Sequence, residues 1–129
     1  MPHKIYLVED HPVMRDAYAR LLAREPDFEM CGVAESAEEA LCAPTLPGCD
    51  LLVTDILLPG MDGIALAAHL RAERPALPVV VISVDREPAT AARAQAAGAR
   101  AYLSKDTLAD TLAITLREVL RDVEIGARA

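Results

Sequence analysis

Five side chains that could handle phosphate or a metal ion stand at the ends of apolar, strand-like segments of the chain. They are two adjacent acids, a third acid, a hydroxyl and a lysine: Glu9, Asp10, Asp55, Ser83 and Lys105. Three carboxylates close together would repel one another, and a hard cation such as Mg²⁺, which prefers oxygen ligands, would relieve that repulsion. A lysine supplies a point positive charge for phosphate, and a hydroxyl donates to a phosphoryl oxygen. Together they would form a site that transfers a phosphoryl group onto a carboxylate.

Strand-like and helix-like segments alternate along the chain, and this alternation would bring the five side chains together. The predicted strands are apolar or β-branched runs at residues 4–8, 28–33, 51–53, 79–82 and 100–103. A helical pattern follows each of them, beginning near residues 12, 36, 64, 88 and 107. Five such units predict an α/β fold with a doubly wound, parallel, five-stranded sheet. The carboxyl ends of parallel strands share one edge, so the five side chains would meet there.

Length, charge and cysteine content limit the classes of function. The 129 residues fit one domain, and a net charge of -7 argues against nucleic-acid binding by this chain alone. No apolar run reaches the ~18 residues of a membrane span, and the N-terminus leads straight into a strand-like run, so we expect no signal peptide. Cys31, Cys42 and Cys49 lack metal-ligand spacing. We expect them to be reduced structural thiols in a cytoplasmic protein.

At these residues the chain resembles the receiver domain of bacterial two-component response regulators. The matching motifs lie at 8–12, 55–63, Ser83, 98–103 and Lys105, in order along the chain. In detail, the segments Glu9-Asp10-His11-Pro12 and Lys105-Asp106 resemble the corresponding segments of the subfamily with a C-terminal helix-turn-helix (LuxR/NarL-like) output domain. The resemblance implies a flavodoxin-like fold with five helices and strand order 2-1-3-4-5. It places the receiver domain at residues 1–123, with 124–129 as a tail or the start of a linker.

The resemblance also implies a phosphoacceptor and a metal site. Asp55 would accept the phosphoryl group from a sensor histidine kinase. Glu9, Asp10, Asp55 and the backbone carbonyl of Leu57 would hold Mg²⁺. Glu9 stands where Asp is commoner, which lengthens one arm of the site and suggests a contact through water.

Three further residues take roles in signalling by the same resemblance. Lys105 would contact the phosphoryl group, and Ser83 would be the switch hydroxyl, at a position where Thr is commoner. Tyr102 would be the aromatic residue that changes rotamer with Ser83. Asp106 follows Lys105 where many members of the family have Pro.

Three functions compete for this set of residues. The first is a phosphorylation-operated switch that promotes only its own phosphorylation and dephosphorylation. The second is a phosphatase or phosphotransferase, which usually needs a second acid two residues past the nucleophile, where this chain has Leu57. The third is a pseudo-receiver that only docks, although such members lose residues that this chain keeps. We expect the first, with a histidine kinase as partner, a phosphorylation-dependent homodimer, no membrane partner, and DNA reached only through a separate C-terminal output domain.

Overall fold

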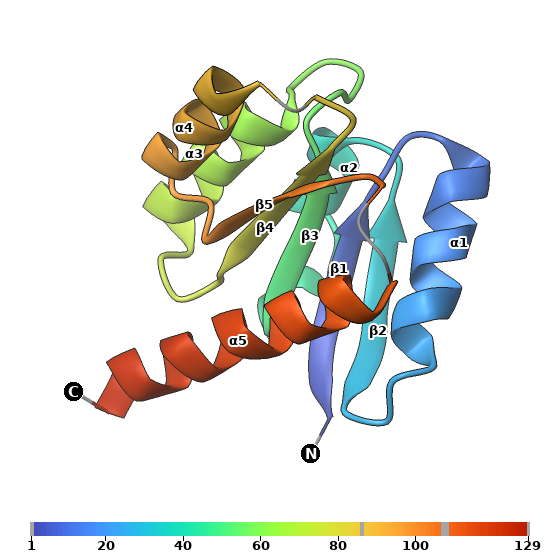
Figure 1. Ribbon diagram of the computed structural model, residues 1–129, viewed down its shortest axis with the longest axis vertical. Coiled ribbons are helices and arrows are strands. Elements are labelled where there is room, and N and C mark those ends of the chain that lie inside the picture. Colours follow the sequence, from blue (N-terminus) through green and yellow to red (C-terminus); the bar gives the residue numbers. More distant parts are fainter. Residues whose placement is uncertain (1, 86, 107–108, 129) are drawn as a thin grey trace.

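The computed structural model describes residues 2–85, 87–106 and 109–128, in which strands and helices alternate (Figure 1). The strands are β1 His3–Val8, β2 Phe28–Ala34, β3 Leu51–Asp55, β4 Val79–Ser83 and β5 Ala101–Ser104. The helices are α1 Pro12–Ala23, α2 Ala37–Leu41, the 3₁₀ turn η1 Leu46–Gly48, α3 Gly63–Glu73, α4 Pro88–Ala96 and α5 Ala109–Arg128. All four strand pairs are parallel, in the order β2-β1-β3-β4-β5. The predicted fold class and strand order are therefore confirmed.

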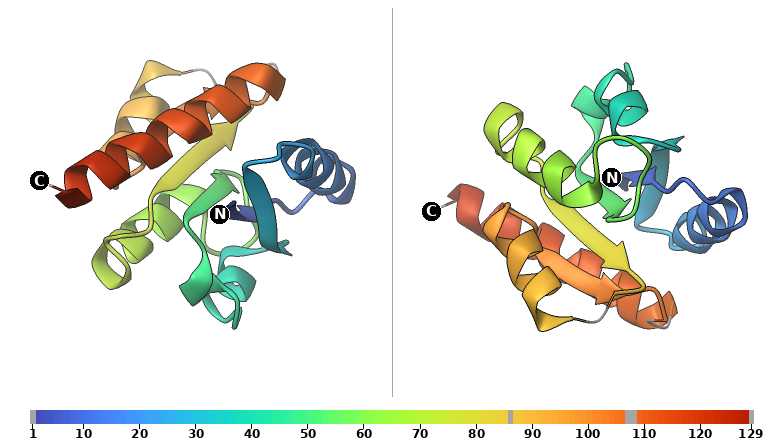
Figure 2. Two further views of the ribbon diagram at one scale, coloured as in Figure 1. Left: turned by 90° about the horizontal axis from the view of Figure 1, so that it is seen from below. Right: turned by 90° about the horizontal axis from the view of Figure 1, so that it is seen from above.

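Two apolar layers cover the sheet, and Figure 2 shows the helices on its two faces. Successive side chains of a strand point to opposite faces. Accordingly, Leu51 and Val53 pack with α1 and α5, while Leu52 packs with α2, α3 and α4. Every residue of β3 and of β4 is buried, because both strands lie inside the sheet with helices on each side. These two strands form the rigid support on which Asp55 and Ser83 stand.

Local signals explain why the loop after β3 folds tightly back over the end of that strand. The Asp62 side chain caps α3 by accepting a hydrogen bond from the N–H of Ala65 over 2.8 Å. Gly63 begins the helix, and a Cβ atom there would lie only 2.1 Å from the carbonyl oxygen of Asp55. Only glycine permits this close approach. The loop is thereby pinned beside the candidate phosphoacceptor.

The final helix continues past Val123, the last residue of the predicted receiver domain. Helix α5 runs to Arg128, so the domain boundary predicted after Val123 falls inside it, and residues 124–128 continue the helix. Ala129, and the predicted helix start near residue 107, lie outside the described residues. None of the helices in the described part of the chain is long and apolar enough to cross a membrane.

The expectation of three reduced cysteines is wrong, because Cys31 and Cys49 form a disulfide. Their Cα atoms are 6.4 Å apart, within the usual range for a disulfide. Cys31 stands at an irregularity of β2: Ile5 pairs with Met30, but Tyr6 pairs with Gly32, so Cys31 is the extra residue. Sequence spacing does not reveal such a bulge. Cys42 is a free thiol, as predicted, but it is exposed and not packed in the core.

Candidate functional site

The five predicted site residues come together at the carboxyl edge of the sheet. Glu9 and Asp10 follow β1, Asp55 ends β3, Ser83 ends β4 and Lys105 follows β5. The chain turns from β1 outward to β2 and later returns to place β3 on the other side of β1. This reversal between β1 and β3 opens a crevice at their carboxyl ends, the usual ligand position in open α/β sheets.

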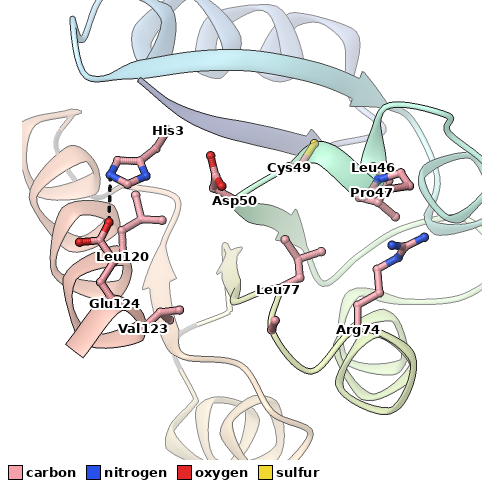
Figure 3. Close-up of a pocket in the computed structure, with 11 residues that line it drawn as sticks. His3, Leu46, Pro47, Cys49, Asp50, Arg74, Leu77, Leu120, Val123 and Glu124 are labelled. Carbon is pink, nitrogen blue, oxygen red and sulfur yellow. Dashed lines mark ion pairs between the residues drawn. The ribbon is translucent and has the colours of Figure 1, made fainter. Parts of the chain in front are cut away.

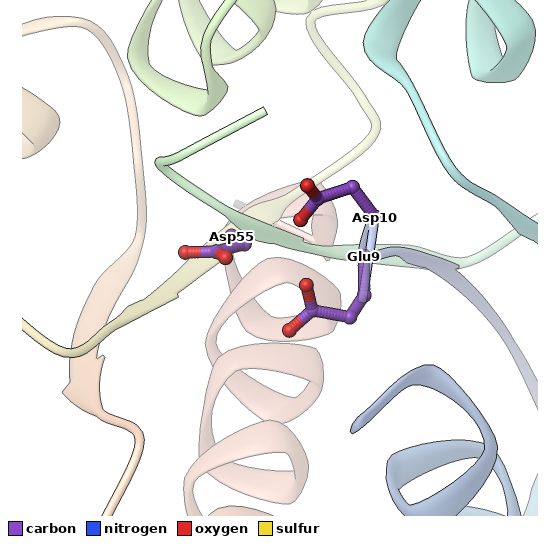
Figure 4. A group of neighbouring side chains, drawn as sticks. All are labelled: Glu9, Asp10 and Asp55. Atoms are coloured by element: carbon purple, nitrogen blue, oxygen red, sulfur yellow. The ribbon is translucent and has the colours of Figure 1, made fainter. Parts of the chain in front are cut away.

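Three carboxylates form the centre of the site, as Figure 4 shows. One oxygen from each of Glu9, Asp10 and Asp55 lies within 4.8 Å of the other two. Glu9 is fully buried and Asp55 is only 3% exposed, whereas Asp10 faces solvent. Burial of charged groups without compensation is costly, so this cluster requires a cation.

Lys105 supplies a cation to the two buried acids. Its ammonium nitrogen lies 2.6 Å from Glu9 Oε1 and 2.8 Å from Asp55 Oδ2. Burial raises the pKa of the Glu9 carboxyl, although hydrogen bonds from Lys105 and from the N–H of His11 act in the opposite direction. Burial tends to lower the pKa of Lys105, but its bonds to Asp55 and Glu9 outweigh it and hold that pKa above the usual value. Lys105 therefore stays charged at neutral pH.

Ser83 and Tyr102 are linked through the loop after β4. Ser83 is fully buried, and its Oγ accepts a hydrogen bond from the N–H of Asp85 over 3.2 Å. The Tyr102 hydroxyl donates to the carbonyl oxygen of the same Asp85. The carbonyl of Ser83 also accepts from the N–H of Lys105 over 2.8 Å. Asp85 therefore contacts both Ser83 and Tyr102, and the backbone of Ser83 contacts that of Lys105.

Two exposed apolar side chains closely follow β3 and β4 along the chain. Leu57 is 63% exposed and Val84 is 64% exposed. The N–H of Leu57 donates to Asp55 Oδ1 over 3.3 Å, which fixes the acid's orientation. The metal-binding role of the Leu57 carbonyl stays a prediction.

Two residues of α1 for which the sequence predicted no role also contact this site. Arg15 donates from Nη1 to the carbonyl oxygens of Glu9 and Asp10, over 3.0 and 3.4 Å. The hydroxyl of Tyr18, itself almost fully buried, donates to the carbonyl of Lys105 over 3.4 Å. The two residues are three apart, so they share one face of the helix. That spacing was the available signal, but it does not say which loops the face meets.

The donor set of the crevice fits Mg²⁺. Three carboxylates within contact range of one ion offer the oxygen ligands that Mg²⁺ favours, and exposed Asp10 leaves room for the water molecules that the ion retains. Asp10 and Asp55 would bind the ion directly. Glu9 lies deeper, with one oxygen on Lys105, so it would act from behind or through water.

A separate surface cavity of about 370 Å³ lies at the opposite end of the sheet (Figure 3). It is bounded by His3, Asp50 and the C-terminal half of α5, and His3 Nε2 lies 3.6 Å from Glu124 Oε1. None of the predicted site residues lines it. The crevice at the carboxyl edge is therefore the candidate site.

Comparison with known proteins identifies the family of this chain. The response regulator receiver domain family matches the chain over residues 5–117. The transcriptional regulatory protein UhpA of Salmonella typhimurium is 32% identical over 115 residues, which are 89% of this chain and 57% of that protein. A protein-glutamate methylesterase/protein-glutamine glutaminase of Syntrophus aciditrophicus is 36% identical over 97% of this chain and 33% of its own length. The chain thus spans between a third and somewhat over half of these relatives.

Among solved structures, the chain is likewise similar to response regulators. The signal receiver domain of a response regulator named NarL from Mycobacterium tuberculosis superposes with a TM-score of 0.88 at 27% identity, covering 93% of this chain and 97% of that one. A LuxR-family two-component response regulator from Aurantimonas superposes with a TM-score of 0.89 at 30% identity, covering 95% and 87%. The subfamily predicted from the sequence is among these relatives. The chain belongs to the response regulator receiver domain family.

Proposed function

We propose that this receiver accepts a phosphoryl group on Asp55 from a sensor histidine kinase, in a reaction that requires Mg²⁺. The observation that carries the proposal is the contact of Lys105 with both Asp55 and Glu9, inside a cluster of three acids at the crevice. A lysine and a cation together neutralise phosphoryl oxygens during transfer. The family match supports the kinase as donor.

The chemistry assigns one task to each group. A carboxylate oxygen of Asp55 attacks phosphorus, the P–N bond of the donor phosphohistidine breaks, and the imidazole leaves with the electron pair and takes up a proton. Mg²⁺, when bound, supplies charge stabilisation to the phosphoryl oxygens. Lys105, with three donors on one nitrogen, exchanges a carboxylate oxygen for a phosphoryl oxygen. We expect no outside substrate to be turned over, because the residue two positions past the nucleophile is Leu57 and not a second acid.

Signalling would begin at Ser83. Its hydroxyl hydrogen is suited to a phosphoryl oxygen on Asp55, and reaching for it would disturb the contact with the N–H of Asp85. Tyr102, bonded to the same Asp85, would then move. A phosphoryl group shifts the two-state equilibrium only through such differential contacts.

The output would be transcriptional, as the names of the regulators among the relatives suggest. We propose a cytoplasmic protein whose phosphorylation favours a homodimer and which reaches DNA through a separate output domain. This chain, with a net charge of -7, should not bind DNA by itself. Titration against random duplex DNA at about 0.15 M salt checks that point.

The test of the proposal is phosphorylation by acetyl phosphate, followed by intact-mass spectrometry. We expect one phosphoryl group per chain with Mg²⁺ and none when the metal is chelated. Asp10→Ala should weaken the Mg²⁺ dependence by removing a metal ligand. Ser83→Ala should still be labelled but should show smaller amide shifts around Tyr102 on adding beryllofluoride. Labelling that is indifferent to Mg²⁺ would refute the proposed chemistry.

A further inference from the structure

We infer that Arg15 is a positioning residue for the metal site: its guanidinium holds the backbone of the acid pair in the shape that binds Mg²⁺. The inference rests on the proposed function, since it concerns the same crevice. It assigns a role to a residue of α1 that carries none of the predicted chemistry.

The geometry places Arg15 behind the acids and not among them. Its Nη1 donates to the carbonyl oxygens of Glu9 and Asp10, over 3.0 and 3.4 Å. Both bonds go to main-chain atoms, so the side chains of the two acids remain directed toward Asp55 (Figure 4). These two residues form the start of the β1–α1 loop, just past the end of β1. The N–H of Glu9 is held by the carbonyl oxygen of Ala34 over 2.9 Å, and Arg15 holds the carbonyl oxygens of Glu9 and Asp10.

A second contact from the same helix supports this reading. Tyr18, one turn further along α1, donates to the carbonyl oxygen of Lys105. The face of α1 that carries Arg15 and Tyr18 therefore touches the main chain of both loops that bring charge to the crevice. Glu9 and Lys105, which contact each other across these two loops, are 96 residues apart in sequence. Helix α1 contacts both loops and therefore holds them in place relative to each other.

If Arg15 acted through its charge alone, it would weaken Mg²⁺ binding and not support it. A guanidinium beside a cation site repels the incoming ion, so its removal should tighten Mg²⁺ binding if Coulomb interaction were all that mattered. Loss of a group that orients metal ligands instead weakens binding, typically by about 10-fold or more. The two accounts therefore predict opposite signs for one substitution.

Two substitutions separate geometry from charge. Arg15→Met removes both the charge and the hydrogen bonds. Arg15→Lys keeps the charge but replaces the planar guanidinium with a compact ammonium that does not reproduce its geometry. The same pair of changes at Arg20 is the matched control, because Arg20 lies on the same helix and is exposed. Its ion pair among the described residues is with Asp16 Oδ2, one turn away on α1, at 3.1 Å.

The measurement is Mg²⁺ titration of the whole chain, followed through the dispersed amide signals that the folded protein gives. We expect both Arg15 variants to raise the Kd for Mg²⁺, by about 10-fold for Arg15→Met and less for Arg15→Lys. Neither Arg20 variant should change it. Acetyl phosphate labelling should need more Mg²⁺ in the Arg15 variants yet reach the same rate at saturation, because Arg15 does not touch the reacting atoms.

Each outcome decides a separate point. Unchanged or tighter Mg²⁺ binding by Arg15→Met would overturn the positioning role while leaving the proposed function intact. Equal loss in the Arg20 variants would also overturn it, by showing a general effect of charge on α1. Failure of the unsubstituted chain to bind Mg²⁺ would instead refute the proposed function itself.

Discussion

Removal of Lys105 should expose how far the site depends on one cation. In Lys105→Met the side-chain volume is nearly kept, but the hydrogen bonds to Glu9 at 2.6 Å and Asp55 at 2.8 Å are lost. Two carboxylates that are at most 3% exposed are then left together without that cation. Breaking a buried pair from one side costs about 3–5 kcal/mol. We expect about 3 kcal/mol, because the crevice opens to solvent at Asp10, or a Tm lower by roughly 10 °C.

The loss of stability in Lys105→Met should depend on pH in a defined direction. Burial raises the pKa of Glu9, and loss of the lysine removes an interaction that opposes the rise. A carboxyl whose folded pKa lies above its unfolded value of about 4.3 stabilises the fold while protonated. That contribution is present below the unfolded pKa and is lost as pH rises through the folded pKa. The free energy of unfolding of the variant should therefore be close to that of the unsubstituted chain at about pH 4, and the full loss should be seen at about pH 7.

The assay is urea unfolding without divalent cations at both pH values, with Lys4→Met as the control. Lys4 is the other lysine of the chain and is exposed, so the same change there should cost less than about 0.5 kcal/mol. Saturating Mg²⁺ should narrow the deficit of Lys105→Met at neutral pH, because the ion neutralises the same acids. A deficit that is equal at both pH values, or smaller than that of Lys4→Met, would refute the reasoning.

Three further results should follow from the structure. Reduction of the Cys31–Cys49 disulfide, which joins residues 18 apart, should lower the free energy of unfolding by about 3 kcal/mol in urea denaturation, and an unchanged midpoint would show that the bond is not formed in solution. Arg117→Met should cost about 1 kcal/mol near neutral pH and less in acid. The reason is that hydrogen bonds from Arg117 lower the pKa of Asp27, so the charged carboxylate stabilises the fold above pH ~4 and this stabilisation is lost as pH falls. An equal loss of stability in Arg117→Met at about pH 2 and at neutral pH would contradict this explanation. Leu57→Asn should shorten the lifetime of the phosphorylated state, measured by intact mass after removal of the phosphodonor, because an amide orients water and leucine does not; an equal or longer lifetime would oppose this.

The sequence predicted the parts of the site that depend on strand ends. Residues at the carboxyl ends of parallel strands must share an edge, so the positions of Glu9, Asp55 and Lys105 followed from the periodicity of the chain. The atomic contacts within the site could not be predicted in the same way. The contact of Lys105 with Glu9, for example, depends on how deeply that acid is buried. The role of Arg15 was hidden for a related reason, since its partners are backbone carbonyls.

Two features of the fold escaped prediction for local reasons. Spacing gave no sign of the disulfide, because a bulge in β2 sets where Cys31 lies relative to the turn before β3. The domain boundary predicted after Val123, where the apolar stripe stops, falls inside α5, which continues to Arg128. A helix does not need a buried face in every turn once its earlier turns are anchored by packing.

Direct localisation of the acyl phosphate tests whether Asp55 carries the phosphoryl group. After labelling with acetyl phosphate and Mg²⁺, borohydride reduction converts a phosphoaspartate to homoserine, which tandem mass spectrometry assigns to one position. We expect homoserine at residue 55 and none in Asp55→Asn. Homoserine at Asp10 in the unsubstituted chain, or labelling of Asp55→Asn to the same extent, would contradict it.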